Sequence, residues 1–64
     1  MNITLNGAPL QTEIQDLARF LNSLFSETRV AVAINGSFVP RAQFEHTQIH
    51  EGDELEVLSP MQGG

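Results

Sequence analysis

The stretch "VAVAING", residues 30–36, decides the fold. It opens with a continuous apolar run that is short enough for a strand and typical of a strand buried on both faces. We therefore predict that residues 30–34 lie in the middle of a sheet. Asn35 and Gly36 suit a type I′ hairpin turn, because both central positions of that turn need positive φ. The following "SFVP", residues 37–40, predicts a short returning strand that Pro40 ends.

A second hairpin is predicted at the start of the chain. "MNITLN", residues 1–6, alternates apolar and polar side chains, which is the period of a strand with one buried face. Asn6 and Gly7 supply another type I′ turn, so a strand should return over residues 8–11. Because Pro9 cannot donate to a ladder, we place this strand at a sheet edge.

A helix is predicted from Thr12 onward. "TEIQ", residues 12–15, has capping-box spacing, with Thr12 as the cap and Gln15 reaching back to it. Phe20 is interpreted as a residue that flanks the helix's apolar stripe, rather than as a partner contact. The stripe itself recurs at helical spacing and should be core: Ile14, Leu17, Ala18, Leu21, Leu24 and Phe25.

The last predicted strand is "ELEVL", residues 54–58, in which Leu55 and Val57 should face inward. The order strand, strand, helix, strands indicates an α+β domain, with a mixed sheet of about four to five strands and one main helix on one face. Whether the first and last strands pair does not follow from periodicity. With 64 residues, the chain is expected to be a single small domain over residues 1–64.

Composition narrows the classes of partner. Three Arg, no Lys and eight Asp or Glu give a formal charge of -5, which would repel a phosphate backbone, so we expect no nucleic-acid binding. Basic partner surfaces are expected instead. No apolar stretch approaches the roughly 18 residues that span a bilayer, and the start lacks the features of a signal peptide. We therefore expect a cytoplasmic protein that does not enter membranes.

The chain ends in "SPMQGG", residues 59–64, which should be a flexible tail. Ordering glycine costs more backbone entropy than ordering any other residue, so Gly63 and Gly64 are either idle or the working end.

His46 and His50 lie four residues apart and beside acidic residues, which raises the question of a metal site. Four-residue spacing brings two ligands together only on a helix, whereas this segment ends in a turn and should point Phe44 and Ile49 inward. We therefore interpret both histidines as solvated surface residues and expect no metal.

Taken together, "VAVAINGSFVPR", Phe44, "IHEGDELEVLSPMQGG" and the terminal glycines resemble the ThiS family, the sulfur carriers of thiamine biosynthesis, across essentially the whole chain. The resemblance implies a ubiquitin-like β-grasp fold with the first and last strands central and parallel. It also implies that an adenylating, ubiquitin-activating-like enzyme consumes ATP to adenylate Gly64. Gly64 would then carry the reacting carboxylate, Gly63 would give the tail clearance because it has no Cβ, and Met61 would be an adaptable apolar contact. A sulfur donor protein then supplies the sulfur of a thiocarboxylate, which passes to the thiazole synthase. Such a carrier is a co-substrate and not an enzyme, and it binds no cofactor of its own.

Contacts with these partners are expected from the tail residues Met61 and Gln62, from Arg41, and from Glu54 and Glu56. Two alternatives stay open: the small subunit of molybdopterin synthase, with the same tail chemistry, and an acidic ubiquitin-like adaptor that binds without reacting. We do not expect catalysis by this chain alone, because no nucleophile, base and orienting partner can be assembled from its residues.

Overall fold

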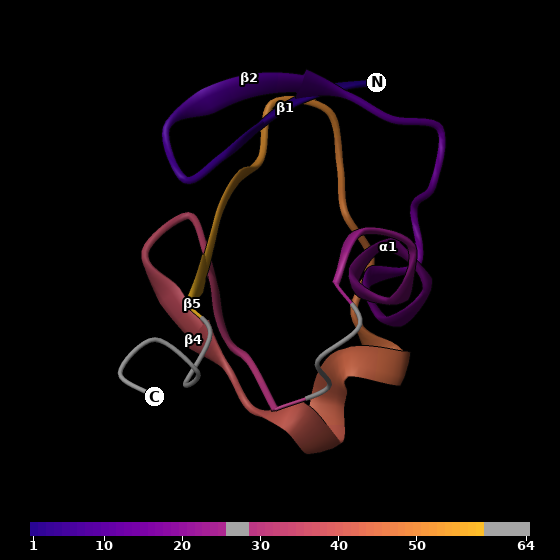
Figure 1. Ribbon diagram of the computed structural model, residues 1–64, viewed down its shortest axis with the longest axis vertical. Coiled ribbons are helices and arrows are strands. Elements are labelled where there is room, and N and C mark those ends of the chain that lie inside the picture. Colours follow the sequence, from indigo (N-terminus) through magenta and orange to yellow (C-terminus); the bar gives the residue numbers. More distant parts are fainter. Residues whose placement is uncertain (26–28, 59–64) are drawn as a thin grey trace.

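A computed structural model of the protein describes residues 1–25 and 29–58. One sheet of five strands runs in the order β2-β1-β5-β3-β4, and it curves around the helix α1 (Figure 1). The elements follow the chain as β1 (Asn2–Leu5), β2 (Ala8–Gln11), α1 (Leu17–Leu24), β3 (Ala31–Ile34), β4 (Ser37–Val39), the 3-10 helix η1 (Arg41–His46) and β5 (Glu54–Leu58).

Both predicted hairpins are confirmed. The positive φ angles that a type I′ turn requires are present at Asn6 (52°) and Gly7 (85°), and again at Asn35 (52°) and Gly36 (84°). β1 pairs antiparallel with β2, and β3 with β4. β2, which contains Pro9, is an edge strand as predicted.

β5 occupies the centre of the sheet, parallel to β1 and antiparallel to β3. This confirms the arrangement of first and last strands that the β-grasp resemblance implied. The predicted alternation is also confirmed, because Leu55 and Val57 are buried whereas Glu54, Glu56 and Leu58 are exposed. The strand therefore has one face in the core and one face toward solvent.

The predicted helix start was wrong. α1 begins at Leu17, and the side chain of Asp16 caps it by accepting a hydrogen bond from the Ala18 backbone N–H at 3.1 Å. Upstream, Ile49 donates to the Gln15 carbonyl at 2.7 Å, and Asp16 forms an isolated bridge with Gln48. Pairing with this distant segment holds residues 15–16 extended, and that tertiary contact overrides the local capping signal at Thr12.

Phe20 is a central core residue, not a flanking one, with only 1% of its surface exposed. Because the helix starts at Leu17, its inward stripe runs through Leu17, Phe20 and Leu21, and Leu24 at the last turn is 48% exposed. The buried core on which both layers meet comprises Ile3, Leu17, Phe20, Leu21, Val30, Val32, Phe44, Ile49, Leu55 and Val57.

The prediction that residues 30–34 are buried on both faces was also wrong. β3 is an interior strand, but Ala31 is exposed and Ala33 is half-buried. α1 and η1 cover only one face of the sheet (Figure 1), so the alternate positions of β3 face solvent. The outward positions carry alanine methyl groups and the inward ones carry the larger Val32 and Ile34, so the apolar run hides an alternation in size.

Among the described residues, no helix is both long and apolar enough to cross a membrane.

Candidate functional site

The end of β5 is where the described chain leads toward the glycine tail, and its position follows from strand pairing. On one side, Leu58 lies opposite Ala31 of β3, and Val57 lies opposite Val32. On the other side, Leu55 pairs with Leu5 of β1. A central strand with buried alternate side chains is usually among the most stable elements of a small sheet, and β5 is such a strand.

The open face of the sheet carries exposed apolar side chains beside this exit point. Leu58 and Phe38 are each 69% exposed. Phe38 lies opposite Ala33, and Leu58 lies opposite Ala31, so two small alanines separate the two large side chains. Single exposed apolar residues are ordinary, but a cluster at the exit of a tail marks a surface for another molecule.

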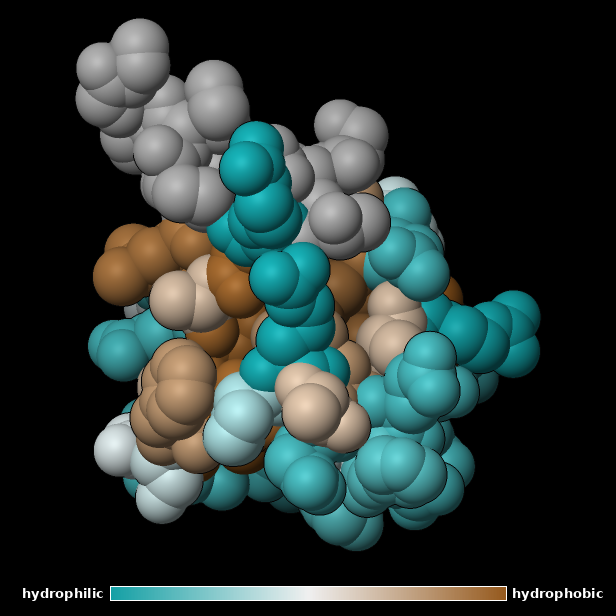
Figure 2. Space-filling view, turned by 90° about the horizontal axis from the view of Figure 1, so that it is seen from below, coloured by the Kyte–Doolittle hydropathy of each residue, from teal (hydrophilic) through white to brown (hydrophobic). Residues whose placement is uncertain are grey.

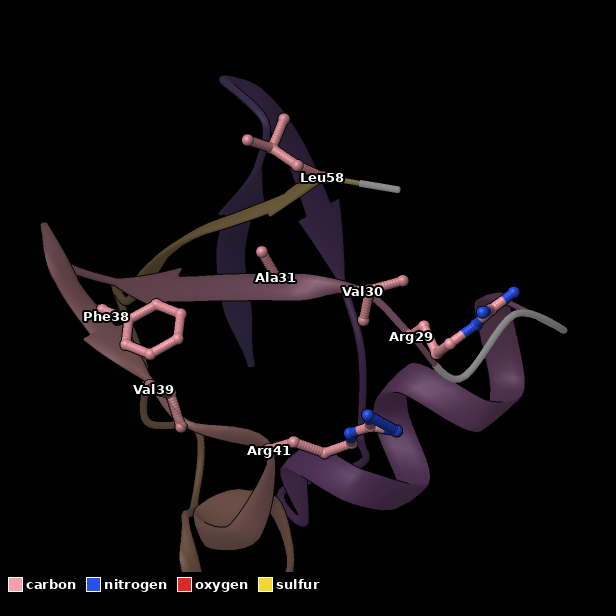
Figure 3. Close-up of a pocket in the computed structure, with 7 residues that line it drawn as sticks. All are labelled: Arg29, Val30, Ala31, Phe38, Val39, Arg41 and Leu58. Carbon is pink, nitrogen blue, oxygen red and sulfur yellow. The ribbon is translucent and has the colours of Figure 1, made fainter. Parts of the chain in front are cut away.

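This cluster borders a hollow of about 510 Å³, which we call the exit hollow. Figure 3 shows the sheet residues on one side of it and the two arginines on the side toward α1. Figure 2 looks at the end of the molecule that carries η1 and shows hydrophobic side chains gathered there with hydrophilic ones around them. The residues that line the exit hollow are Arg29, Val30, Ala31, Phe38, Val39, Arg41 and Leu58.

Charge is divided unevenly around the exit hollow. Arg29 and Arg41 are two of the three basic side chains in a chain of net charge -5, and both line it. Glu56 lines a smaller hollow on the open face with Phe38 and Leu58, and Glu54 lies farther back along β5. The exit hollow therefore carries positive charge on its side toward α1, whereas the open face carries the acidic Glu56 beside Phe38 and Leu58.

The predicted site residues fall into two groups. Arg41, Glu54 and Glu56 are all exposed, and Arg41 and Glu56 border hollows that share Phe38 and Leu58. The residues predicted in the tail lie outside the described residues: Met61, Gln62, Gly63 and Gly64.

Sequence reasoning missed Arg29, Phe38 and Leu58 as members of the site. The signal for Phe38 and Leu58 was present, because each takes the outward phase of its strand alternation, where a large apolar residue is unexpected. Arg29 carried no such signal, since its place beside Arg41 depends on how the chain enters β3.

Within residues 1–25 and 29–58, no group of three or more His, Asp or Glu side chains could hold a metal ion. His50 instead belongs to the turn before β5: its backbone N–H donates to Asp53 Oδ2 at 2.8 Å, and its Nδ1 is 3.9 Å from the same oxygen. Phe44 and Ile49 are buried, as predicted.

Comparison with protein families gives a match to the model described as "ThiS family" over residues 3–64. A crystal structure of a thiamine biosynthesis protein (ThiS) from Geobacter metallireducens has a TM-score of 0.83 and 30% identity, with full coverage of both chains. An NMR solution structure of a thiamine biosynthesis protein from the same organism has a TM-score of 0.81 and 33% identity, covering all of this chain and 88% of that one.

Two further proteins are similar in sequence. Each is called "Uncharacterized protein ycf40". The protein from Porphyra purpurea is 33% identical over 66 residues, and that from Pyropia yezoensis is 32% identical over 68 residues. Each alignment covers the whole of this chain and 93% of the relative.

Proposed function

Because the chain belongs to the ThiS family, we propose that it is a sulfur carrier of thiamine biosynthesis whose Gly64 carboxylate is adenylated and then converted to a thiocarboxylate. The observation that carries this proposal is the extent of the family match, which runs through residue 64 and so includes both terminal glycines. The described fold supports it, because β5 leads to that terminus from the centre of the sheet.

The chemistry begins with a poor electrophile. A free α-carboxyl has a pKa of roughly 3.3 to 3.7, so the Gly64 carboxylate is an anion at neutral pH. In the activating enzyme, a carboxylate oxygen attacks the α-phosphorus of ATP, and pyrophosphate leaves. A sulfur nucleophile then attacks the carbonyl carbon of the mixed anhydride, the bond to the AMP oxygen breaks, and AMP leaves with that electron pair. With hydrosulfide as nucleophile, one proton is released and a thiocarboxylate remains.

The two glycines suit both steps. Gly64 presents its carbonyl carbon without a Cβ on either side, and Gly63 lets the backbone pass through a narrow channel. The sulfur donor protein and the thiazole synthase must in turn reach the same terminus. We assign this chain the role of co-substrate, with every catalytic group supplied by its partners.

The open face of the sheet is the surface that we assign to partner docking. Phe38 and Leu58 supply an exposed apolar centre next to the tail's exit, as expected for the core of a protein interface. Glu54 and Glu56 would meet basic side chains of the activating enzyme and the thiazole synthase, and Arg41 an acidic one. Met61 and Gln62 would contact the channel that receives the tail.

The similar solved structures, both of thiamine biosynthesis proteins, favour the thiazole synthase over molybdopterin synthase as the enzyme that receives the sulfur. A direct test supplies the thiocarboxylated chain separately to a thiazole synthase and to a molybdopterin synthase large subunit. Sulfur transfer to the thiazole product alone supports the proposal, and transfer only to the molybdopterin precursor would replace it.

Adenylation is tested by exchange of labelled pyrophosphate into ATP, catalysed by the activating enzyme. We expect the full chain to stimulate exchange and a Gly64-deleted chain to compete for the enzyme without stimulating it. Binding without exchange by the full chain, on an enzyme competent with another carrier, would favour the adaptor instead.

A further inference from the structure

The backbone N–H and C=O of Val57 point toward the β1 side of β5, beyond the last residue of β1. The Leu55 carbonyl accepts from the Asn6 N–H at 2.8 Å, so Leu55 points its polar groups toward β1. Residues two apart in a strand point the same way, and Val57 therefore presents its N–H and C=O to the same side. β1 ends at Leu5, and the chain turns away through Asn6 and Gly7.

The side chain of Asn6 supplies the missing pairing. Its Oδ1 accepts from the Val57 N–H at 2.9 Å, and its Nδ2 donates to the Val57 carbonyl at 3.2 Å. A carboxamide has the same donor and acceptor as a peptide group, so Asn6 adds one rung to the ladder between β1 and β5. Without it, both groups of Val57 would lose their partner at a partly buried position.

The other hairpin provides a natural comparison. Asn35 has the same φ of 52°, and its Oδ1 accepts from the Glu54 N–H at 3.0 Å. Its Nδ2 donates to Asp53 Oδ1, also at 3.0 Å. Asn35 thus braces the first residue of β5, whereas Asn6 braces the residue before the last.

We propose that Asn6 is a positioning residue, which keeps the C-terminal end of β5 paired with its neighbours. We call this paired arrangement the closed strand end, and it makes the tail leave the sheet from the same point and in the same direction. This inference rests on the proposed function. Ala31 pairs with Leu58 from the β3 side, and Asn6 holds Val57 from the β1 side. Opening of this end would carry Leu58 away from the exit hollow and remove the apolar anchor next to the reacting tail.

The expected kinetic effect is on binding and not on chemistry. If the activating enzyme binds only carriers with a closed strand end, its apparent dissociation constant equals the intrinsic one divided by the fraction of carriers that are closed. Loss of both side-chain bonds should raise the KM for the carrier by about fivefold to tenfold, with kcat at saturation unchanged within about twofold.

The test compares Asn6→Gly with Asn35→Gly. Glycine adopts positive φ readily, so each substitution keeps its type I′ turn and removes only the side-chain bonds. NMR measures the hydrogen-exchange rate of the Val57 backbone N–H in both variants, and steady-state kinetics with the activating enzyme give KM and kcat. We expect faster Val57 exchange, by about fiftyfold or more, because a fivefold to tenfold rise in KM requires most carriers to be open. Both effects are expected in Asn6→Gly only.

Equal rises in KM in both variants would show that Asn6 only stabilises the protein in general, and this would overturn the proposal. An unchanged KM in Asn6→Gly, together with faster Val57 exchange, would also overturn it. If Asn6→Gly fails to fold, Asn6→Asp takes its place, because it keeps the turn and the acceptor and loses the donor to the Val57 carbonyl. It should also raise the KM, because the second carboxylate oxygen then faces the Val57 carbonyl and repels it. A wild-type KM would contradict the positioning role. A wild-type chain that is never adenylated would instead contradict the proposed function, while Val57 exchange would still report whether Asn6 holds the strand.

Discussion

Phe38 and Leu58 lie on the same open face of the sheet, on either side of β3, and both line the exit hollow with 69% of their surface exposed. Neither contributes much to the core, yet together they place an apolar surface beside the point from which the tail departs. This relationship separates what the protein needs to fold from what it needs to bind.

Replacing Phe38 by Thr should therefore weaken binding to the activating enzyme without unfolding the protein. Threonine retains strand propensity at an edge strand, and we expect a change in unfolding free energy within about 0.5 kcal/mol. The dissociation constant, measured by calorimetry, should rise by roughly tenfold or more for a central apolar contact. Leu24→Gln, at an exposed apolar residue on α1, is the matched control and should leave binding unchanged. Equal losses in both variants would disprove the assignment of the open face.

The carboxylates of β5 should act mainly on the rate of association. In the variant Glu54→Gln with Glu56→Gln, we expect the association rate constant to fall by about threefold to tenfold at low salt. The difference from wild type should disappear near 1 M salt, where the screening length is roughly 3 Å. Stopped-flow fluorescence measures this, and Glu13→Gln with Glu45→Gln gives the same change in net charge at other positions. A salt-insensitive difference would rule out the electrostatic role.

Phe20→Ala tests the corrected description of the core. Removing a ring that is 1% exposed should cost about 3 to 5 kcal/mol, which is a large share of the stability of a small domain. Urea unfolding followed by circular dichroism measures the loss. A loss of less than about 1 kcal/mol in the free energy of unfolding would support the sequence-based interpretation that Phe20 only flanks the apolar stripe.

The position of the helix start is tested by a pair of substitutions. Asp16→Ala removes the observed cap and should cost about 1 kcal/mol. Gln15→Ala removes the side chain that a capping box begun at Thr12 would use, and it should change stability by less than about 0.5 kcal/mol. The same urea titration compares them, and the reverse order of effects would place the helix start at Thr12.

The histidines should not respond to zinc as a pair of ligands. One equivalent of zinc, followed by NMR of the imidazole resonances, is expected to leave His46 and His50 unshifted. Stoichiometric shifts of both imidazoles would reveal a site that the described residues do not predict.

Local signals in the sequence were sufficient where the structure is local. Asn6-Gly7 and Asn35-Gly36 specify their turns through backbone conformation alone, and the alternation of residues 54–58 specifies which side of β5 is buried. The helix start was not predictable in the same way, because Asp16 pairs with Gln48, far along the chain. Tertiary pairing of this kind overrides a capping signal.

The candidate site was only partly predictable. Glu54, Glu56 and Arg41 followed from charge and motif, but the exit hollow requires Arg29, Phe38 and Leu58 to meet from three separate segments. The second role of Asn6 was hidden for a related reason. The hairpin turn alone is enough to account for an asparagine at position 6. Only the register of β1 against β5 brings its side chain to Val57.

The central claim concerns Gly64, and intact mass spectrometry tests it most directly. The purified chain is incubated with ATP, a cognate activating enzyme and sulfide, beside a Gly64-deleted control. We predict a mass gain equal to the exchange of one oxygen for one sulfur, located at the last residue by fragmentation and absent from the control. An unchanged mass, with an activating enzyme that modifies another carrier under the same conditions, would contradict the sulfur-carrier account.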